Sequence, residues 1–533
     1  SITSGGNYNV VVGDEAGTNL TTGDANVAVG QAAFETNNTG SYNVAIGTSA
    51  LNANTTASNN TAVGYNSLAV NTIGAGNVAV GYQAADAITE GSDNVSVGLA
   101  ALTSDTLGNK SVAVGNYSLA YQNFTSATDT YNTAVGYQAG NRVTTGVSNT
   151  LIGGLAGDAI TDADYNVALG YSSLTTNQLG SKSTAIGTFS LNNQNPASAT
   201  DMFNTAVGYA AGGVITTGTY NTLIGGLAGD GMTTGTTNVA VGTQSLSGVV
   251  TGSNNVAVGH TSLEDVTSGH ENTAIGRSSG LQLTEGGENV IVGYQALQAD
   301  TKGHRATAIG LNALATQNFT SVTNNYNVGV GYSAGVAVTT GIKNTLIGGQ
   351  AGDNITSGSL NVIIGQGVDA PSATADNQLN IGNWIKGSVG QITMPLQPAF
   401  SVNPLSLQSN IAVSTQVTVV FNEEVFDVGS NFASNTFTAP ATGKYQLNLA
   451  LRLHNMDTAA AYYQVRFETS NRSYLITFDL GGLSSDPVYW AEAFSVLADM
   501  DTNDTVAVKI FQGGGTAQTD IHPESYFTGY LVA

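Results

Sequence analysis

Three acidic residues near the C-terminus have a spacing that calcium ligands can have. Asp499, Asp501 and Asp504 lie in the segment Asp-Met-Asp-Thr-Asn-Asp, and carboxylates at alternate positions begin the calcium loop of an EF-hand. The glycine at the sixth position and the glutamate at the twelfth position of such a loop are missing. The same acids fit a turn before a strand at residues 505–510, which needs no metal. The sequence therefore leaves two interpretations open, a turn and a calcium site, and calcium is the only cofactor that it suggests.

The sequence contains little that could support catalysis. Its five histidines lie in unrelated contexts and show no pattern of a Ser-His-Asp triad. They are His260, His270, His304, His454 and His522. Carboxylate pairs of the kind that polysaccharide depolymerases use remain open, but Asp158, Asp230 and Asp353 recur in identical Ala-Gly-Asp turns, which favours turn capping. We predict that the chain is not an enzyme.

Tyrosines that recur directly after a repeated glycine can stack on sugar rings. They are Tyr65, Tyr82, Tyr137, Tyr171, Tyr209, Tyr294 and Tyr332. Their common position predicts a row of rings along one edge of a repetitive structure. The alternative is that the rings pack over the corners of the repeats, and the sequence leaves both roles open.

A five-residue motif, Asn-Val/Thr-Ala-Val/Ile-Gly, positions these tyrosines. Its closing glycine recurs from Gly13 to a degenerate copy at Gly382, with eighteen intervals of 17 residues and three of 21 residues. A fixed period of this length indicates a solenoid in which each repeat forms one rung. The longer intervals predict three four-residue loop insertions. Hexapeptide and pectinase-like β-helices remain alternatives to the β-roll that we favour.

The motif alternates as a β-strand does. In residues 26–30 the two valines share one face and the alanine lies on the other, and we expect both faces to be buried. Ala33, three positions after the glycine, represents a small residue that predicts close backbone approach. A 17-residue rung with two expected strands cannot close a core alone, so rungs must stack on their neighbours and on other chains.

Composition narrows the class of protein and its partners. The 36 acidic and 13 basic residues give a formal net charge of −23, which disfavours nucleic acid as a partner. No apolar run approaches the length that crosses a bilayer, so we predict no membrane insertion. The 67 glycines and the 9% of charged residues are typical of turn-rich β-structure.

The repeat resembles the head of trimeric autotransporter adhesins. The shared pattern is asparagine, a small residue, alanine, an aliphatic residue and glycine, then alanine or serine three residues later. The resemblance implies a left-handed parallel β-roll, packed as a trimer, over residues 1–370. The period in that family is typically shorter, so larger outward loops are expected here.

The repeat decays in residues 371–397, which we predict to be a neck. The string at residues 377–384, Asn-Gln-Leu-Asn-Ile-Gly-Asn-Trp, resembles junctions that precede C-terminal modules in phage tail fibres. Charged and aromatic residues become more frequent from Pro398 onward, where the period disappears. A separate domain is therefore expected at residues 398–533.

This last domain resembles the globular head of complement-type collagen-like proteins and their tumour-necrosis-factor relatives. Three segments have the family's signatures in order: Pro-Ala-Phe-Ser-Val at 398–402, Phe-Thr-Ala-Pro-Ala-Thr-Gly-Lys-Tyr at 437–445 and Tyr-Phe-Thr-Gly-Tyr-Leu at 526–531. The resemblance implies a jelly-roll β-sandwich that forms tight trimers.

The whole chain is thus predicted to be all-β, with a long trimeric β-solenoid rod followed by a jelly-roll head. We expect a homotrimeric attachment fibre, in particular a phage tail fibre that contacts a glycan or protein on a host cell surface. We expect a docking protein of the tail at the N-terminus of this chain. The chain would then be located on the virion. The alternative is a bacterial surface adhesin, or a subunit of a structural extracellular filament.

Overall fold

The computed structural model describes residues 5–532, so Ser1–Ser4 and Ala533, with the docking end expected at Ser1, lie outside the described residues. The described residues contain strands and turns but no helix, and so no helix that could span a membrane. The chain divides into two compact units, Ser1–Gln378 and Leu379–Ala533. The predicted neck at residues 371–397 is shared between them, and each unit is described by itself.

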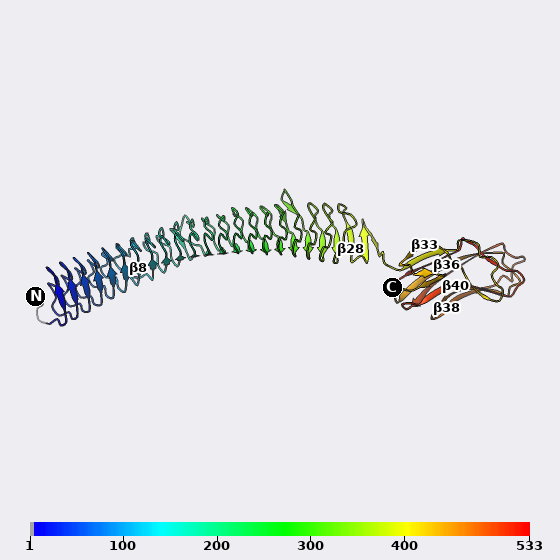
Figure 1. Ribbon diagram of the computed structural model, residues 1–533, viewed down its shortest axis with the longest axis horizontal. Coiled ribbons are helices and arrows are strands. Elements are labelled where there is room, and N and C mark those ends of the chain that lie inside the picture. Colours follow the sequence, from blue (N-terminus) through cyan, green and yellow to red (C-terminus); the bar gives the residue numbers. More distant parts are fainter. Residues whose placement is uncertain (1–4, 533) are drawn as a thin grey trace. The chain divides into compact units, whose positions relative to one another are not determined.

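The first unit is a β-solenoid of about 22 turns with 17-residue rungs, in which one short strand per rung lies along the same side (Figure 1). The strands are β1 (Val10–Val12), β2 (Val27–Val29), β3 (Val44–Ile46), β4 (Thr61–Val63), β5 (Val78–Val80), β6 (Val95–Val97), β8 (Val112–Val114), β10 (Thr133–Val135), β11 (Thr150–Ile152), β12 (Val167–Leu169), β14 (Thr184–Ile186), β16 (Thr205–Val207), β17 (Thr222–Ile224), β18 (Val239–Val241), β19 (Val256–Val258), β20 (Thr273–Ile275), β21 (Val290–Val292), β23 (Thr307–Ile309), β25 (Val328–Val330), β26 (Thr345–Ile347), β27 (Val362–Ile364) and the degenerate β28 (Gln378–Ile381).

Neighbouring strands pair in parallel and in register, so equivalent motif residues stack on one another. Val27 of β2, for example, lies beside Val44 of β3. The expectation of two strands in every rung was wrong. The segment after the strand contains residues with positive φ, such as Ala32 at 52° and Phe34 at 57°, and a β-strand cannot contain them. Its amides still bond between rungs, since Phe34 N–H donates to the Ala50 carbonyl at 2.9 Å.

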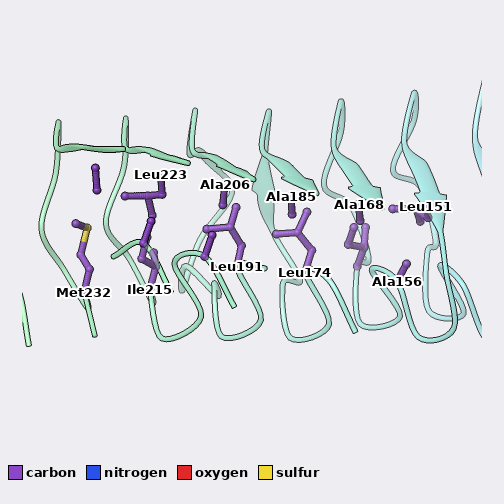
Figure 2. Packing of buried hydrophobic residues seen from close by; sticks show 14 of the residues in the cluster. Leu151, Ala156, Ala168, Leu174, Ala185, Leu191, Ala206, Ile215, Leu223 and Met232 are labelled. Carbon is purple, nitrogen blue, oxygen red and sulfur yellow. The ribbon is translucent and has the colours of Figure 1, made fainter. Parts of the chain in front are cut away.

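The core of the rod lies between the strands and these turns. Figure 2 shows Ala168 and Ala185 of the strands on one side, and Leu174 and Leu191 of the turns on the other. All four side chains are fully buried within a single chain. Stacked rungs therefore close this core within one chain, and packing on other chains stays a prediction.

Asparagine at the start of each motif forms a buried ladder along the rod. Asn255 is fully buried; its main-chain N–H donates to Oδ1 of Asn238 at 2.9 Å, and its Nδ2 donates to the Gly269 carbonyl at 2.9 Å. The next asparagine, Asn272, repeats the pattern by donating its main-chain N–H to Oδ1 of Asn255 at 3.1 Å. The ladder satisfies main-chain groups that would otherwise be buried without a partner.

Glycine at the end of the motif is required by both conformation and space. Gly64 has a φ of 135°, and a Cβ atom there would lie 2.3 Å from the carbonyl oxygen of Gly81 in the next rung. This close approach of successive backbones explains why the glycine recurs at almost every turn.

The three predicted insertions add short strand pairs outside the main sheet. These are β7 (Gly108–Asn109) with β9 (Thr128–Asp129), β13 (Gly180–Ser181) with β15 (Thr200–Asp201), and β22 (Gly303–His304) with β24 (Thr323–Asn324). At each insertion the ladder asparagine is replaced, by Ser111, Ser183 or Ala306. A buried glutamine then takes part instead, as where Nδ2 of Asn132 donates to Oε1 of Gln122 at 2.9 Å.

The boundary between the units falls within β28, and the second unit contains an antiparallel hairpin and a jelly-roll sandwich. The hairpin is β29 (Ile385–Ser388) with β30 (Gln391–Thr393). One sheet has the order β33 (Glu423–Val428), β31 (Ala399–Asn403), β42 (Tyr526–Leu531), β36 (Gly443–His454) and β39 (Tyr489–Met500), with β41 (Asp520–Ile521) beside β36. The other has β34 (Phe432–Ala433), β35 (Thr436–Thr438), β40 (Thr505–Gly513), β37 (Tyr462–Thr469) and β38 (Ser473–Phe478), with β32 (Gln416–Thr418) beside β40.

The signature segments of the head meet in its core. Phe400 stacks on Phe437 with ring centroids 4.5 Å apart, and Phe527 lies edge-on to Phe400 at 4.8 Å. Tyr445, also fully buried, donates its hydroxyl to the Ala441 carbonyl at 2.8 Å and so fixes the turn before β36. The signatures therefore specify the packing of the sandwich.

Candidate attachment surfaces

The rod presents an apolar sheet face to its surroundings. In the three-residue strands from β1 to β27 the first and third residues point outward, and all of them are valine, threonine, isoleucine or leucine. Ile275, for example, is 43% exposed, whereas Ala274 between the outward residues is fully buried. The alternation was predicted correctly, but the valine face is not buried within one chain.

The size of this sheet face is unusual for a protein surface. Strands spaced about 4.8 Å apart over about 21 rungs, each roughly 7 Å long, give on the order of 700 Å². Single-chain proteins rarely expose apolar patches larger than a few hundred Å². The face therefore has the size and composition of a protein interface.

Two rows of aromatic residues flank the sheet face. The row that precedes the motif asparagine was missed by sequence reasoning and consists of Tyr8, Tyr42, Tyr131, Tyr165, Phe203, Tyr220 and Tyr326, all exposed. Its signal was present in the sequence, since these residues share one position of the repeat.

The seven tyrosines that follow the glycine form the second row. All are 41–58% exposed. Tyr65 and Tyr82, in adjacent rungs, stack on each other with centroids 5.3 Å apart. Tyr294 has the guanidinium of Arg277 over its ring at 5.8 Å. The predicted row exists, and some of its members pack on neighbours; glycan stacking stays a prediction.

Buried carboxyl groups lie under two of the insertions. Asp105 is fully buried and accepts hydrogen bonds from Nε2 of Gln122 at 2.6 Å and from the Gly108 N–H at 3.1 Å. Asp300 has the same contacts with Gln317 and Gly303, whereas Asn177 occupies this place in the second insertion. Burial raises the pKa of both aspartates, although their hydrogen bonds oppose the shift.

The recurrent Ala-Gly-Asp acids lie apart from one another along the solenoid. Burial raises the pKa of Asp158 and of Asp230, and Asp158 accepts a hydrogen bond from the Thr175 hydroxyl of the next rung. Asp158, Asp230 and Asp353 belong to different rungs, and the absence of enzymatic activity stays a prediction.

The three acids of the calcium hypothesis lie around one turn of the head. Asp504 accepts from Ser470 Oγ at 2.7 Å and from the Asp501 N–H at 2.8 Å, which lowers its pKa. Asp499 lies 3.6 Å from the ammonium of Lys444. In residues 5–532 no group of three acidic, histidine or cysteine side chains is arranged to hold a metal ion. The contacts are those of a turn, and calcium stays a prediction.

One face of the sheet that contains β36, β39 and β42 also has exposed aromatic and aliphatic residues. Tyr489 and Leu497 of β39 and Tyr530 of β42 are 46–58% exposed. Between these strands, Gln446 of β36 donates from Nε2 to Ser495 Oγ at 2.7 Å. The face therefore combines aromatic residues with a polar centre, as protein interfaces do.

At one end of this sheet, two histidines that are far apart in the sequence stack on each other. The rings of His454 and His522 lie 4.2 Å apart, and Arg452 lies close by with its guanidinium over the Tyr489 ring at 5.0 Å. Desolvation, with His522 and Arg452 nearby, lowers the pKa of His454. The two residues are 68 positions apart in the sequence, which explains why sequence reasoning did not bring them together.

Comparisons with known proteins identify the family of the head but not of the rod. The family model of the C1q domain matches residues 399–532. A solved structure of the globular domain of a zebrafish complement 1qA protein is 19% identical, covering 26% of this chain and 98% of its own, with a TM-score of 0.20. Murine APRIL at pH 8.0 is 16% identical, covering 26% of this chain and 99% of its own, with a TM-score of 0.20. No curated protein matches the chain. The C-terminal unit thus contains a C1q jelly-roll domain, which confirms the resemblance in the head.

Proposed function

We propose that this chain is one subunit of a homotrimeric extracellular attachment fibre of the phage tail-fibre type. The C1q domain suggests a trimeric, extracellular or adhesive protein, because C1q and tumour-necrosis-factor-like domains are typically trimeric. The rod supplies reach, and its surface or the head contacts a host surface.

The observation that supports the proposal most strongly is the apolar sheet face of the rod. A partner for this face must present matching apolar surface at the same axial spacing over the length of the rod. A second copy of the chain has that spacing by construction, and three copies agree with the symmetry of the head. No charged side chain lies at the outward positions of the three-residue strands from β1 to β27, so like charges do not oppose the contact.

A trimeric fibre also suits attachment. Three linked copies of a weak site bind a multivalent surface far more tightly than one copy does. A docking protein at the N-terminal side and a glycan or protein receptor on a host are the partners that this role requires.

Single-cysteine variants test the proposal, because the natural chain contains no cysteine. Ile275→Cys on the sheet face is expected to form disulfide-linked chains on oxidation. Thr267→Cys in an exposed turn is the matched control and is expected not to do so. The mass of the full-length protein, measured by sedimentation, should be three times 54.1 kDa. A monomer mass with no cross-link at position 275 would refute the trimeric rod, and trimers joined end to end would favour a filament subunit.

A further inference from the structure

The first insertion surrounds one exposed tyrosine with hollows on two sides. Tyr121 is 60% exposed and lies in the turn after β8, seven residues beyond the end of that strand. One hollow, of about 330 Å³, is lined by Tyr121, Tyr117 and Gln138. The other, of about 410 Å³, is lined by Tyr121, Arg142 and Thr144. Hollows of this size lie at the small end of ligand sites in proteins.

The three insertions lie in similar blocks of sequence, which contain residues 121–142, 193–214 and 316–337, and a comparison of these blocks shows that the side chains beside Tyr121 are not required by the fold. The three insertions share their rung register, their buried glutamine and their extra strand pair. At the position of Tyr121 the other two blocks have Asn193 and Thr316. At the position of Asn141 they have Gly213 and Val336, and at the position of Arg142 they have Val214 and Ala337. Only the first block therefore combines an aromatic ring, an amide and a cation.

The polar groups beside Tyr121 are available to a ligand. Arg142 is exposed and, like Arg277 and Lys343, forms no ion pair with any of residues 5–532, whereas Lys110, Lys182, Lys302 and Arg305 of the rod are ion-paired. The electrostatic neighbour of Arg142 is Asp158. Asn141 donates from Nδ2 to the Tyr117 carbonyl at 3.0 Å, which fixes the amide and leaves its Oδ1 as an acceptor.

We propose that these residues form a carbohydrate-binding site. A sugar ring stacks on the exposed face of Tyr121, because the apolar face of a pyranose ring complements an aromatic ring. Arg142 donates hydrogen bonds to hydroxyl or carboxylate oxygens of the sugar, and Asn141 Oδ1 accepts from a hydroxyl group. The inference deepens the proposed attachment function by naming its ligand class. Tyr121 lies outside the sheet face proposed as the trimer interface, so assembly leaves it open.

Titration of the full-length protein with defined oligosaccharides tests the site. The probes are neutral chito-oligosaccharides and malto-oligosaccharides and the carboxylated oligogalacturonate, observed by saturation-transfer NMR and calorimetry. Tyr121→Asn and Arg142→Val introduce the residues of the second block, so both variants are expected to fold. We expect binding of at least one probe by the natural chain and about tenfold weaker binding by Tyr121→Asn.

The second block offers the matched gain of function. Asn193→Tyr combined with Val214→Arg should add a second site, which doubles the number of sugars bound per chain. If Arg142→Val weakens only oligogalacturonate, the ligand is an acidic sugar, and if it weakens neutral probes equally, the ligand is neutral. Absence of binding to every probe at millimolar concentration, or unchanged binding by Tyr121→Asn, would overturn the proposal. The sedimentation mass of each variant separates this result from the trimer question, since a trimer that binds no sugar contradicts only the carbohydrate site.

Discussion

Removal of one asparagine side chain from the buried ladder should destabilise the rod strongly, and mainly in the rungs beside it. In an Asn255→Ala variant two buried main-chain groups lose their partner. The N–H of Asn272 no longer donates to Oδ1 of Asn255, and the carbonyl of Gly269 no longer accepts from Nδ2 of Asn255. A buried main-chain group left without a partner costs about 1–3 kcal/mol, so two cost on the order of 4 kcal/mol. His260→Ala changes an exposed side chain of the same rung and should cost less than about 0.5 kcal/mol.

Hydrogen exchange measured by mass spectrometry reads this effect locally, which matters because a long repeat protein does not unfold in one step. The amides of β19 and β20 should exchange up to about 10³-fold faster in Asn255→Ala than in the natural chain, since each 1.4 kcal/mol is a factor of ten. Exchange within about threefold of the His260→Ala control would refute the view that the ladder stabilises the rod.

Three further changes test other parts of the structure. Asp105→Asn should raise the melting temperature most at neutral pH. Burial raises the pKa of Asp105, so the natural chain gains stability as the pH falls through that pKa, and the difference in melting temperature between variant and natural chain should shrink towards about pH 4. The pKa of His454 is lowered, so the fold favours the neutral imidazole. The stability that this gives above the unfolded-state pKa of 6.5 should be lost as the pH falls below that value. A His454→Gln variant should lose less stability over this range when unfolding is followed by the fluorescence of Trp490. Gly64→Ala places a Cβ atom 2.3 Å from a carbonyl oxygen at a φ of 135° and should destabilise its rungs by at least about 2 kcal/mol in hydrogen exchange, whereas Gly226→Ala, with no atom within 4 Å of the new Cβ, should not.

The repeat could be predicted well because the stacked rungs make each position serve one purpose. Asn255 must bond to the rungs on both sides, Ala274 must fit a closed core and Gly64 must allow backbones to approach. Each requirement leaves the same residue type at the same position, so the period of 17 residues, the strand and the all-β class follow from the sequence. The head was recognised by signatures whose residues, such as Phe437 and Tyr445, pack in its core.

The second strand of the rung was predicted wrongly for a physical reason. Alternating positive φ at residues such as Ala32 and Phe34 lets a turn bond to neighbouring rungs as a strand would. The sequence pattern of small and aliphatic residues is the same in both cases. The candidate attachment surfaces could not be predicted from the sequence in this detail. The hollows around Tyr121 and the stacking of His454 on His522 depend on residues that only the fold brings together.

Electron cryomicroscopy of the isolated full-length protein tests the central claim most directly, since it shows how many chains form the rod and which faces meet. We predict rods of three chains with the outward residues of the three-residue strands from β1 to β27 buried against one another, and with the turn that contains Tyr121 on the outside. Rods of a single chain, or trimers in which the sheet face remains open to solvent, would contradict the account.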